Sequence, residues 1–225
     1  MAYSIETIVP LGRSYDEYVE MFALTSTDLT GRILGCADGP ASFNAIHSAN
    51  GGSVVSADPL YDFSSEQIHH RIEETFPEAM RQVRLNRSEF VWDRIHSVDE
   101  LADLRKQAMD CFLEDYPKGK SDGRYVPCGL PNLPFKDQTF DLALCSHYLF
   151  LYSAQLSSAF HMRSIRELCR VAVEVRIFPL LEIGSVNSRH LDAVLASLRG
   201  SGYDCSVETV PYEFQRGANA MLRVK

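Results

Sequence analysis

The sequence lacks a long hydrophobic run. No uninterrupted apolar segment approaches the roughly 18 residues that a membrane-spanning helix requires. The first residues include Glu6, Pro10 and Arg13 and lack the apolar stretch of a secretory signal. We therefore expect a cytoplasmic protein that has no membrane partner.

Positive charge is also scarce. The chain has 22 Lys and Arg residues against 30 Asp and Glu residues, which gives a formal net charge of −8. Affinity for a nucleic-acid backbone needs clustered Lys and Arg side chains that displace counterions. This balance leaves room for a local basic patch, but it argues against a nucleic-acid partner.

Paired cysteine motifs are missing as well. The six cysteines include no Cys-x-x-Cys pair, and four of them lie in or beside apolar helix or strand patterns. This favours reduced, structural thiols over disulfides or metal ligands. His69 and His70 are adjacent, but a helix places neighbouring residues about 100° apart, which is a poor geometry for sharing a metal ion. We expect no dedicated metal site.

What remains is an ordinary globular composition. The chain has 225 residues, of which 45% are hydrophobic and 23% are charged. A chain of this length can bury a sizeable core as one unit. We expect a single α/β domain over residues 1–225 rather than two small domains.

Small residues follow the first apolar strand candidate, which runs from Arg32 to Leu34. Gly35, Ala37 and Gly39 form a turn in which the backbone can approach a ligand closely, and the turn opens a helix expected over about 41–48. The arrangement is typical of the first half of a nucleotide-binding βαβ unit.

The second strand of this unit, expected over 53–57, ends at Asp58. A carboxylate at that place can accept hydrogen bonds from two ribose hydroxyls at once. The alternative role of Asp58 is to form a turn before Pro59. The spacing of the whole unit suits an adenosine.

Two stretches carry a family resemblance. The sequence Leu-Gly-Cys-Ala-Asp-Gly, which ends at Gly39, resembles the Gly-x-Gly-x-Gly first motif of class I S-adenosylmethionine-dependent methyltransferases, and Leu133 to His147 resembles the later loop and fourth strand of that family. Through Ser146 to Ser153 and Pro211 to Gly217, the chain also resembles an uncharacterised bacterial branch of the family.

The resemblance covers most of residues 31–225 and implies both a fold and a cofactor. The fold is a doubly wound, seven-stranded Rossmann-like sheet with its last strand antiparallel and helices on both faces. The cofactor is S-adenosylmethionine, with S-adenosylhomocysteine as the product. The residues that this resemblance places at the cofactor are Gly35, Cys36, Ala37, Gly39, Asp58, Pro59, Gly129, Leu130, Ser146 and His147.

Three positions depart from the family pattern. Ile33 and Gly129 stand where the family commonly has acids, and Ala37 replaces a glycine. Asp38 lies inside the turn, where it can partly substitute for the missing acid or cap the following helix. These departures support an alternative, a catalytically silent module that binds a ligand or another protein.

Candidate catalytic residues follow the fourth strand, which we expect over 140–146. Ligands lie beyond the carboxyl ends of the strands in such a sheet, so His147 and Tyr148 should meet cofactor and substrate. A histidine can act as a proton acceptor, and aromatic faces can stabilise a sulfonium. The alternative is that these aromatic groups are part of the core. Arg216, between the last two strands, is a further candidate substrate contact.

Helical patterns surround these strands. A capping box at Ser14 opens a helix expected over 14–24. It either packs on the sheet or, as the resemblance implies, covers the methionine end of the cofactor, with Arg13, Tyr15 or Tyr18 near its carboxylate. An insertion over about 64–120 predicts two helices, the first of them broken or kinked at Pro77.

The insertion has two possible roles. We interpret it as a cap that builds the substrate pocket, because added segments in such folds usually do so while the sheet stays constant. The alternative is a flap that pads the sheet edge or forms a homodimer contact. The sequence leaves both roles open, and it does not identify the methyl acceptor.

The functional hypothesis is methyl transfer from S-adenosylmethionine to a small molecule. An NAD-dependent oxidoreductase is less favoured, because Ser42 stands where the third glycine of that motif belongs. A nucleic-acid methyltransferase is disfavoured by the net charge, and no Asn-Pro-Pro-Tyr-like or Pro-Cys motif follows the fourth strand.

Overall fold

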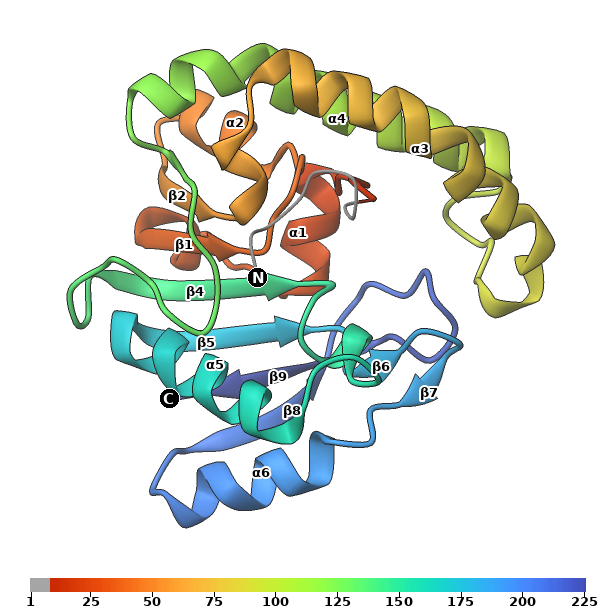
Figure 1. Cartoon of the computed structure of the whole chain (residues 1–225). Helices are drawn as coiled ribbons and strands as arrows, with labels where there is room; N and C mark the ends of the chain where they lie inside the picture. Colours follow the sequence, from red (N-terminus) through yellow and green to blue (C-terminus); the bar gives the residue numbers. More distant parts are fainter. Residues whose placement is uncertain (1–8) are drawn as a thin grey trace.

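The computed structural model describes residues 9–225, which form one central sheet with helices on both faces (Figure 1). The strand order is β3-β2-β1-β4-β5-β9-β8, and β9 is antiparallel to both of its neighbours. The predicted doubly wound, seven-stranded fold is therefore confirmed. The strands are β1 (Arg32–Cys36), β2 (Ser53–Ala57), β3 (Tyr125–Val126), β4 (Phe140–Ser146), β5 (Ala172–Phe178), β8 (Cys205–Thr209) and β9 (Ala220–Val224).

Helices and one small hairpin complete the fold. The helices are α1 (Tyr15–Met21), α2 (Phe43–Ala49), α3 (Ser65–Leu85), α4 (Val98–Ser121), α5 (Ser158–Val171) and α6 (Leu191–Gly200), and β6 (Leu181–Glu182) pairs with β7 (Val186–Asn187). Within residues 9–225, no helix is both long and apolar enough to cross a membrane.

Strand β4 shows why the sheet is covered on both faces. Leu142 and Leu144 belong to the core beneath α1, α3 and α4, whereas Ala143 and Cys145 belong to the core beneath α5 and α6. Successive side chains of a strand point to opposite faces. A near-continuous apolar run is therefore buried throughout, as in other sheets with helices on both sides.

Several predicted boundaries need correction. The apolar pattern predicts a fifth strand over 174–181, but β5 ends at Phe178, because Pro179 has no amide hydrogen to continue the ladder. The α3 helix runs through Pro77 without a break. Pro77 is exposed, so the carbonyl that loses its partner faces water, and the buried stripe of α3 that includes Phe76 packs without interruption.

The insertion spans the sheet from its β3 side to the other end of the strand order. Helices α3 and α4 lie side by side, and their connecting tip reaches the segment between β8 and β9 (Figure 1). There the amide of Val91 donates to the carbonyl of Phe214 at 2.8 Å, and Phe90 forms a bridge with Gln215. The tip of the insertion is thereby held against the connection between the last two strands.

Candidate active site

The glycine loop lies directly after β1. Ala37 has a left-handed backbone with φ 59°, a conformation that costs a non-glycine residue about 1–2 kcal/mol, and its amide donates to the carbonyl of Ala57 at 2.9 Å. Gly39 is also left-handed, with φ 52°. The loop therefore keeps the backbone course of a glycine-rich turn although the sequence places alanine at 37.

Asp38 folds back over the start of this loop. A Cβ atom at Gly35 would lie 1.8 Å from Asp38 Oδ2, so any larger residue at position 35 would displace the Asp38 carboxylate. Tyr18 Oη donates to Asp38 Oδ1 at 2.8 Å, and Ser56 Oγ donates to Oδ2 at 2.7 Å. The capping role considered for Asp38 is wrong, because its two oxygens face α1 and β2. Tyr18 is a site residue whose partner the sequence did not reveal.

Burial raises the pKa of Asp38 to about 7, against the opposing hydrogen bonds from Ser56 and Tyr18. An acid whose pKa is higher in the folded chain stabilises the fold most at low pH, and this stabilisation is lost as pH rises towards 7. We expect Asp38→Asn to be more stable than the parent by roughly 1–3 kcal/mol at pH 8 and nearly equal at pH 4 or below. Urea unfolding at both pH values measures the difference, with the exposed Asp62→Asn as control. Parallel pH profiles for the parent and Asp38→Asn would contradict the assignment.

Asp58 joins the loop after β2 to the loop after β1. Its Oδ2 accepts from the amide of Gly39 at 2.9 Å, and its Oδ1 accepts from the amide of Leu60 at 2.8 Å. Tyr61 adds a bond from Oη to the carbonyl of Gly39 at 2.8 Å. Asp58 thus caps the short turn over Pro59–Asp62. Each carboxylate oxygen keeps a second acceptor position, so the ribose role remains a prediction.

The predicted residues after β3 lie close to Asp58 in space. A Cβ atom at Gly129 would meet Pro59 Cγ at 3.0 Å, so the two loops are in contact. Leu130 packs against the core beneath α5. The structure therefore brings Pro59 and Gly129 to one place beside the glycine loop.

Ser146 and His147 close the other side of this loop, because β4 pairs with β1. His147 is left-handed, with φ 51°, and its amide donates to the carbonyl of Phe178 at 2.7 Å. Its Nδ1 lies 2.9 Å from Ser146 Oγ, and its ring meets the Phe178 ring edge-on. Burial, followed by the charges of Arg13 and Arg105, lowers the pKa of His147 well below its ordinary value. The ring is neutral at neutral pH and is a weak base.

The other two catalytic candidates lie in different surroundings. Tyr148 packs beside Phe160, with ring centroids 6.4 Å apart. Arg216 donates to the backbone carbonyls of Ser88 at 3.3 Å and Phe90 at 3.1 Å. Arg216 therefore connects the β8–β9 connection to the tip of the insertion through hydrogen bonds. Its side chain is exposed.

A buried ionic cluster lies beside His147. Arg105 is 1% exposed, and its two terminal nitrogens donate to the two oxygens of Glu17 at 2.5 and 2.6 Å. Tyr212 Oη donates to the same carboxylate at 2.7 Å. The sequence signal for Arg105 was its place on the apolar stripe of α4, between Leu101 and Met109, where a charge needs a partner.

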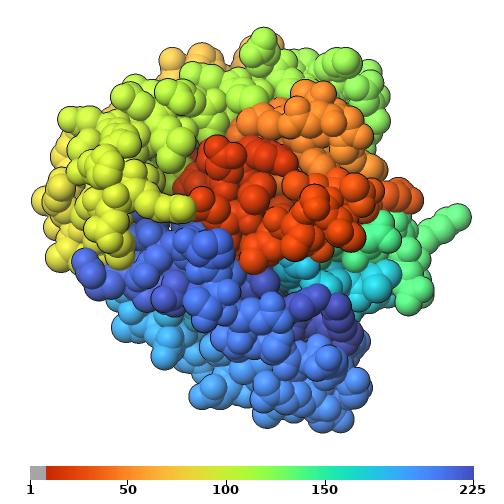
Figure 2. Space-filling view, turned by 180° about the vertical axis from the view of Figure 1, so that it is seen from behind, coloured from red at the N-terminus to blue at the C-terminus, as the bar shows by residue number. Residues whose placement is uncertain are grey.

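Two hollows open near these elements. One, of about 340 Å³, lies where α1, the insertion and the β8–β9 connection meet, an area visible in Figure 2. It is lined by Ser14, Asp16, Glu17, Glu20, Val91, Arg94, Ile95, Leu104, Tyr212, Glu213 and Phe214.

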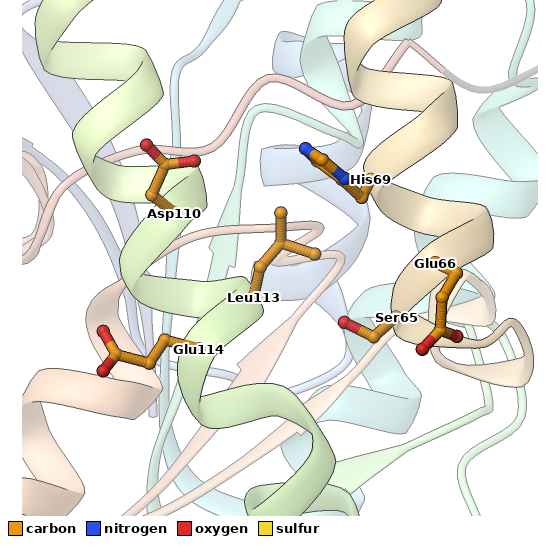
Figure 3. A pocket seen from close by; sticks show the side chains of 6 residues that line it. All are labelled: Ser65, Glu66, His69, Asp110, Leu113 and Glu114. Carbon is orange, nitrogen blue, oxygen red and sulfur yellow. The ribbon is translucent and has the colours of Figure 1, made fainter.

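The other hollow, of about 360 Å³, lies between α3 and α4, where His69 faces Asp110 (Figure 3). Residues 9–225 hold no group of three or more His, Cys, Asp or Glu side chains fit for a metal ion.

The strand order, the glycine loop after β1 and the acid after β2 define a doubly wound, Rossmann-like α/β protein. The chain belongs to the family of the uncharacterized protein MJ0045 of the archaeon Methanocaldococcus jannaschii. The two are 32% identical over 223 residues, which cover 99% of this chain and 98% of that protein. No family model matches the chain.

Several solved structures are similar to this chain at low sequence identity. The PH0226 protein of Pyrococcus horikoshii is 14% identical with a TM-score of 0.47, and the match covers 92% of this chain and 87% of that one. Magnesium protoporphyrin IX methyltransferase of Synechocystis, solved with bound S-adenosylmethionine, is 11% identical with a TM-score of 0.47, and the match covers 93% and 76%. A TehB-like methyltransferase of Corynebacterium glutamicum is 15% identical with a TM-score of 0.46, over 93% and 86%.

Proposed function

We propose that this protein transfers a methyl group from S-adenosylmethionine to a small-molecule acceptor. The observation that carries the proposal is the hydrogen bond between the Gly39 amide and Asp58, which holds the acid after β2 against the glycine loop after β1. S-adenosylmethionine is a nucleoside that carries an amino acid. Its binding needs an acid for the ribose hydroxyls next to a glycine loop that accommodates the amino-acid part.

The residues present fit such a cofactor. Asp58 can accept two hydroxyl hydrogen bonds without giving up its bonds to Gly39 and Leu60, because each oxygen has a second lone pair. Gly39 would meet no described atom within 4 Å if it carried a Cβ, so its outer side has room for a ligand. Gly129 and Leu130 would contribute backbone groups at the adenine.

The cofactor supplies a methyl group that its sulfonium already activates, so the protein has to bind, align and exclude water. Alignment of reacting groups is worth roughly 7–11 kcal/mol of the barrier. His147 is neutral and can accept a hydrogen bond from a hydroxyl or amine of the acceptor, although its lowered pKa makes it a weak base. The net charge of −8 favours a small acceptor over a nucleic acid.

A second candidate function, a catalytically silent module, is favoured by one specific feature. The Asp38 carboxylate fills the space above Gly35, where the family loop has open glycine backbone, and Asp38 is fixed there by Tyr18 and Ser56. A loop closed by its own side chain has less room for the amino-acid end of a cofactor. The two functions differ in whether adenosyl ligands bind.

Isothermal titration calorimetry separates them. We expect S-adenosylmethionine and S-adenosylhomocysteine to bind with micromolar dissociation constants, because the adenosine contacts are common to both, and NAD, the control ligand, not to bind. Absence of heat with both adenosyl ligands would overturn the methyltransferase proposal in favour of the silent module. Binding of NAD alone would favour an oxidoreductase.

A further inference from the structure

A buried chain of polar groups leads from Asp38 to His147. Tyr18 Oη donates to Asp38 Oδ1 at 2.8 Å, and Ser146 Oγ lies 2.9 Å from His147 Nδ1. Burial and then the Asp38 carboxylate raise the pKa of Tyr18, and a hydrogen bond from the Ser146 hydroxyl opposes this rise. Asp38, Tyr18 and Ser146 are at most 8% exposed, so bulk water has little access to these contacts.

The strand geometry also places Ser146 next to Tyr18. Side chains two residues apart in a strand point to the same face of the sheet. Leu142 and Leu144 of β4 belong with Tyr18 to the core on the α1 side, and Ser146 is the next residue of this series. Ser146 therefore points to the face of the sheet that α1 covers.

The direction of each hydrogen bond in the chain follows from the number of protons available. Burial raises the pKa of Asp38 to about 7, so this carboxyl is mainly ionised at pH 8 and only accepts. Tyr18 and Ser146 each carry one hydroxyl proton. Because Tyr18 donates to Asp38, it accepts from Ser146. Ser146 then accepts from His147, whose ring proton must lie on Nδ1.

This arrangement leaves the lone pair of His147 on Nε2. Within residues 9–225, Nε2 has no hydrogen-bond partner, and it is not a fully buried atom. The left-handed backbone of His147 and the edge-on ring of Phe178 fix the direction of the imidazole. The ring lies at the carboxyl end of β4, where ligands of such sheets bind. Nε2 is therefore the ring atom that a ligand can reach.

We infer that Asp38, Tyr18 and Ser146 are positioning residues that keep the proton of His147 on Nδ1, which makes Nε2 the atom that accepts the proton of a hydroxyl or amine to be methylated. The inference rests on the proposed function for the presence of a methyl acceptor. It deepens that function, because it assigns the methylated atom as an oxygen or nitrogen that carries a hydrogen.

The same chain offers the proton a path. As the oxygen or nitrogen of the acceptor bonds to the methyl carbon, the bond between that carbon and sulfur breaks, and its electron pair stays on sulfur. The proton of the acceptor moves to Nε2, and the Nδ1 proton moves to Ser146. The Ser146 proton then moves to Tyr18, and the Tyr18 proton moves to Asp38. The proton thus ends on a carboxylate that binds protons near pH 7, although His147 itself is a weak base.

Nitrogen NMR of the histidine rings in the unliganded, ¹⁵N-labelled protein at pH 8 tests this inference. Protonated and unprotonated ring nitrogens differ strongly in chemical shift, and the signals missing from His147→Gln identify His147. We expect the parent to carry its proton on Nδ1. In Tyr18→Phe the Ser146 hydroxyl has lost its acceptor and can donate to Nδ1, so the His147 proton should move to Nε2.

Tyr61→Phe is the matched control. Tyr61 is also buried, but its hydroxyl donates to the Gly39 carbonyl and is not part of the chain. This variant should keep the proton of His147 on Nδ1. A parent with the proton on Nε2 would overturn the inference, and so would a Tyr18→Phe protein with the same tautomer as the parent.

A second variant decides the question if Tyr18→Phe does not fold. Ser146→Ala removes the acceptor of the Nδ1 proton, so the proton should move to Nε2, where water can accept from it. Ser164→Ala is its control, because Ser164 is a buried serine whose Oγ has no partner within residues 9–225. A proton that stays on Nδ1 in Ser146→Ala would overturn the inference.

Failure of the inference and failure of the proposed function can be told apart, because the tautomer is measured without a cofactor. A parent with the proton on Nδ1 that binds neither adenosyl ligand would overturn the proposed function and support the positioning of His147. A parent that binds both ligands but carries the proton on Nε2 would support the function and overturn the positioning.

Discussion

Replacing Glu17 with alanine is expected to lower the free energy of unfolding by about 3–5 kcal/mol, the usual cost of removing one partner of a buried ion pair. Arg105 would be left 1% exposed without its carboxylate. Urea unfolding at pH 7 measures the loss. Glu20→Ala is the matched control, because Glu20 is also on α1 but pairs at the surface with Arg94, and such pairs contribute about 0–1 kcal/mol.

The pH dependence of this variant provides a check on the cause. Burial alone would raise the pKa of Glu17, but the attraction of Arg105 overcomes it and lowers the pKa to about 2. A lowered pKa means that the stabilisation is complete above the ordinary value near 4.5 and is lost as pH falls towards 2. The parent should lose this contribution on acidification, whereas Glu17→Ala lacks it at every pH. A Glu17→Ala protein as stable as Glu20→Ala would refute the buried ion pair.

The second large effect is expected at Asp58. Changing it to alanine should weaken S-adenosylhomocysteine binding by about 100-fold or more, because two hydrogen bonds to a charged acceptor are lost. Calorimetry well below the unfolding midpoint measures the affinity, and Asp62→Ala is the control, since Asp62 is exposed on the same short turn. An unchanged dissociation constant in Asp58→Ala would remove the ribose assignment.

Asp58 also stabilises its own turn, so a ligand-side comparison is needed to isolate the ribose contact. The 2′-deoxy analogue of S-adenosylhomocysteine should bind the parent more weakly than the full ligand does. Asp58→Ala should bind the 2′-deoxy analogue and the full ligand with equal affinity, because the side chain that accepts from the 2′-hydroxyl is absent. An equal deficit in both proteins would mean that Asp58 acts only by holding Gly39 and Leu60 in place.

Local sequence patterns predicted helix starts and strand boundaries correctly where residues close in the sequence determine the structure. The capping box at Ser14 forms as expected, and strands β2 and β4 begin and end at the predicted residues. The prediction at Pro77 was wrong because the buried stripe of α3 outweighs one lost hydrogen bond at an exposed position. The helix predicted over 14–24 ends at Met21. The capping motif therefore predicted the start of the helix correctly, whereas the predicted end was too late.

The candidate site was predictable only in part. The glycine loop, Asp58 and Ser146–His147 meet because parallel strands deliver their carboxyl ends to one edge of the sheet. Arg216 was proposed as a substrate contact, but it is bound to backbone carbonyls of the insertion, a partner more than 120 residues away in the chain. Such long-range pairing leaves no periodic signal in the sequence.

The sequence by itself determined the βαβ unit, the order of helices and strands and the resemblance that implies a cofactor, because these depend on residue spacing and on backbone preferences within short segments. Only the tertiary structure decided which charges are compensated. Glu17 and Arg105 are 88 residues apart, and Tyr212 lies further still along the chain. Their pairing depends on how the insertion folds over the sheet, because a buried charge needs a partner.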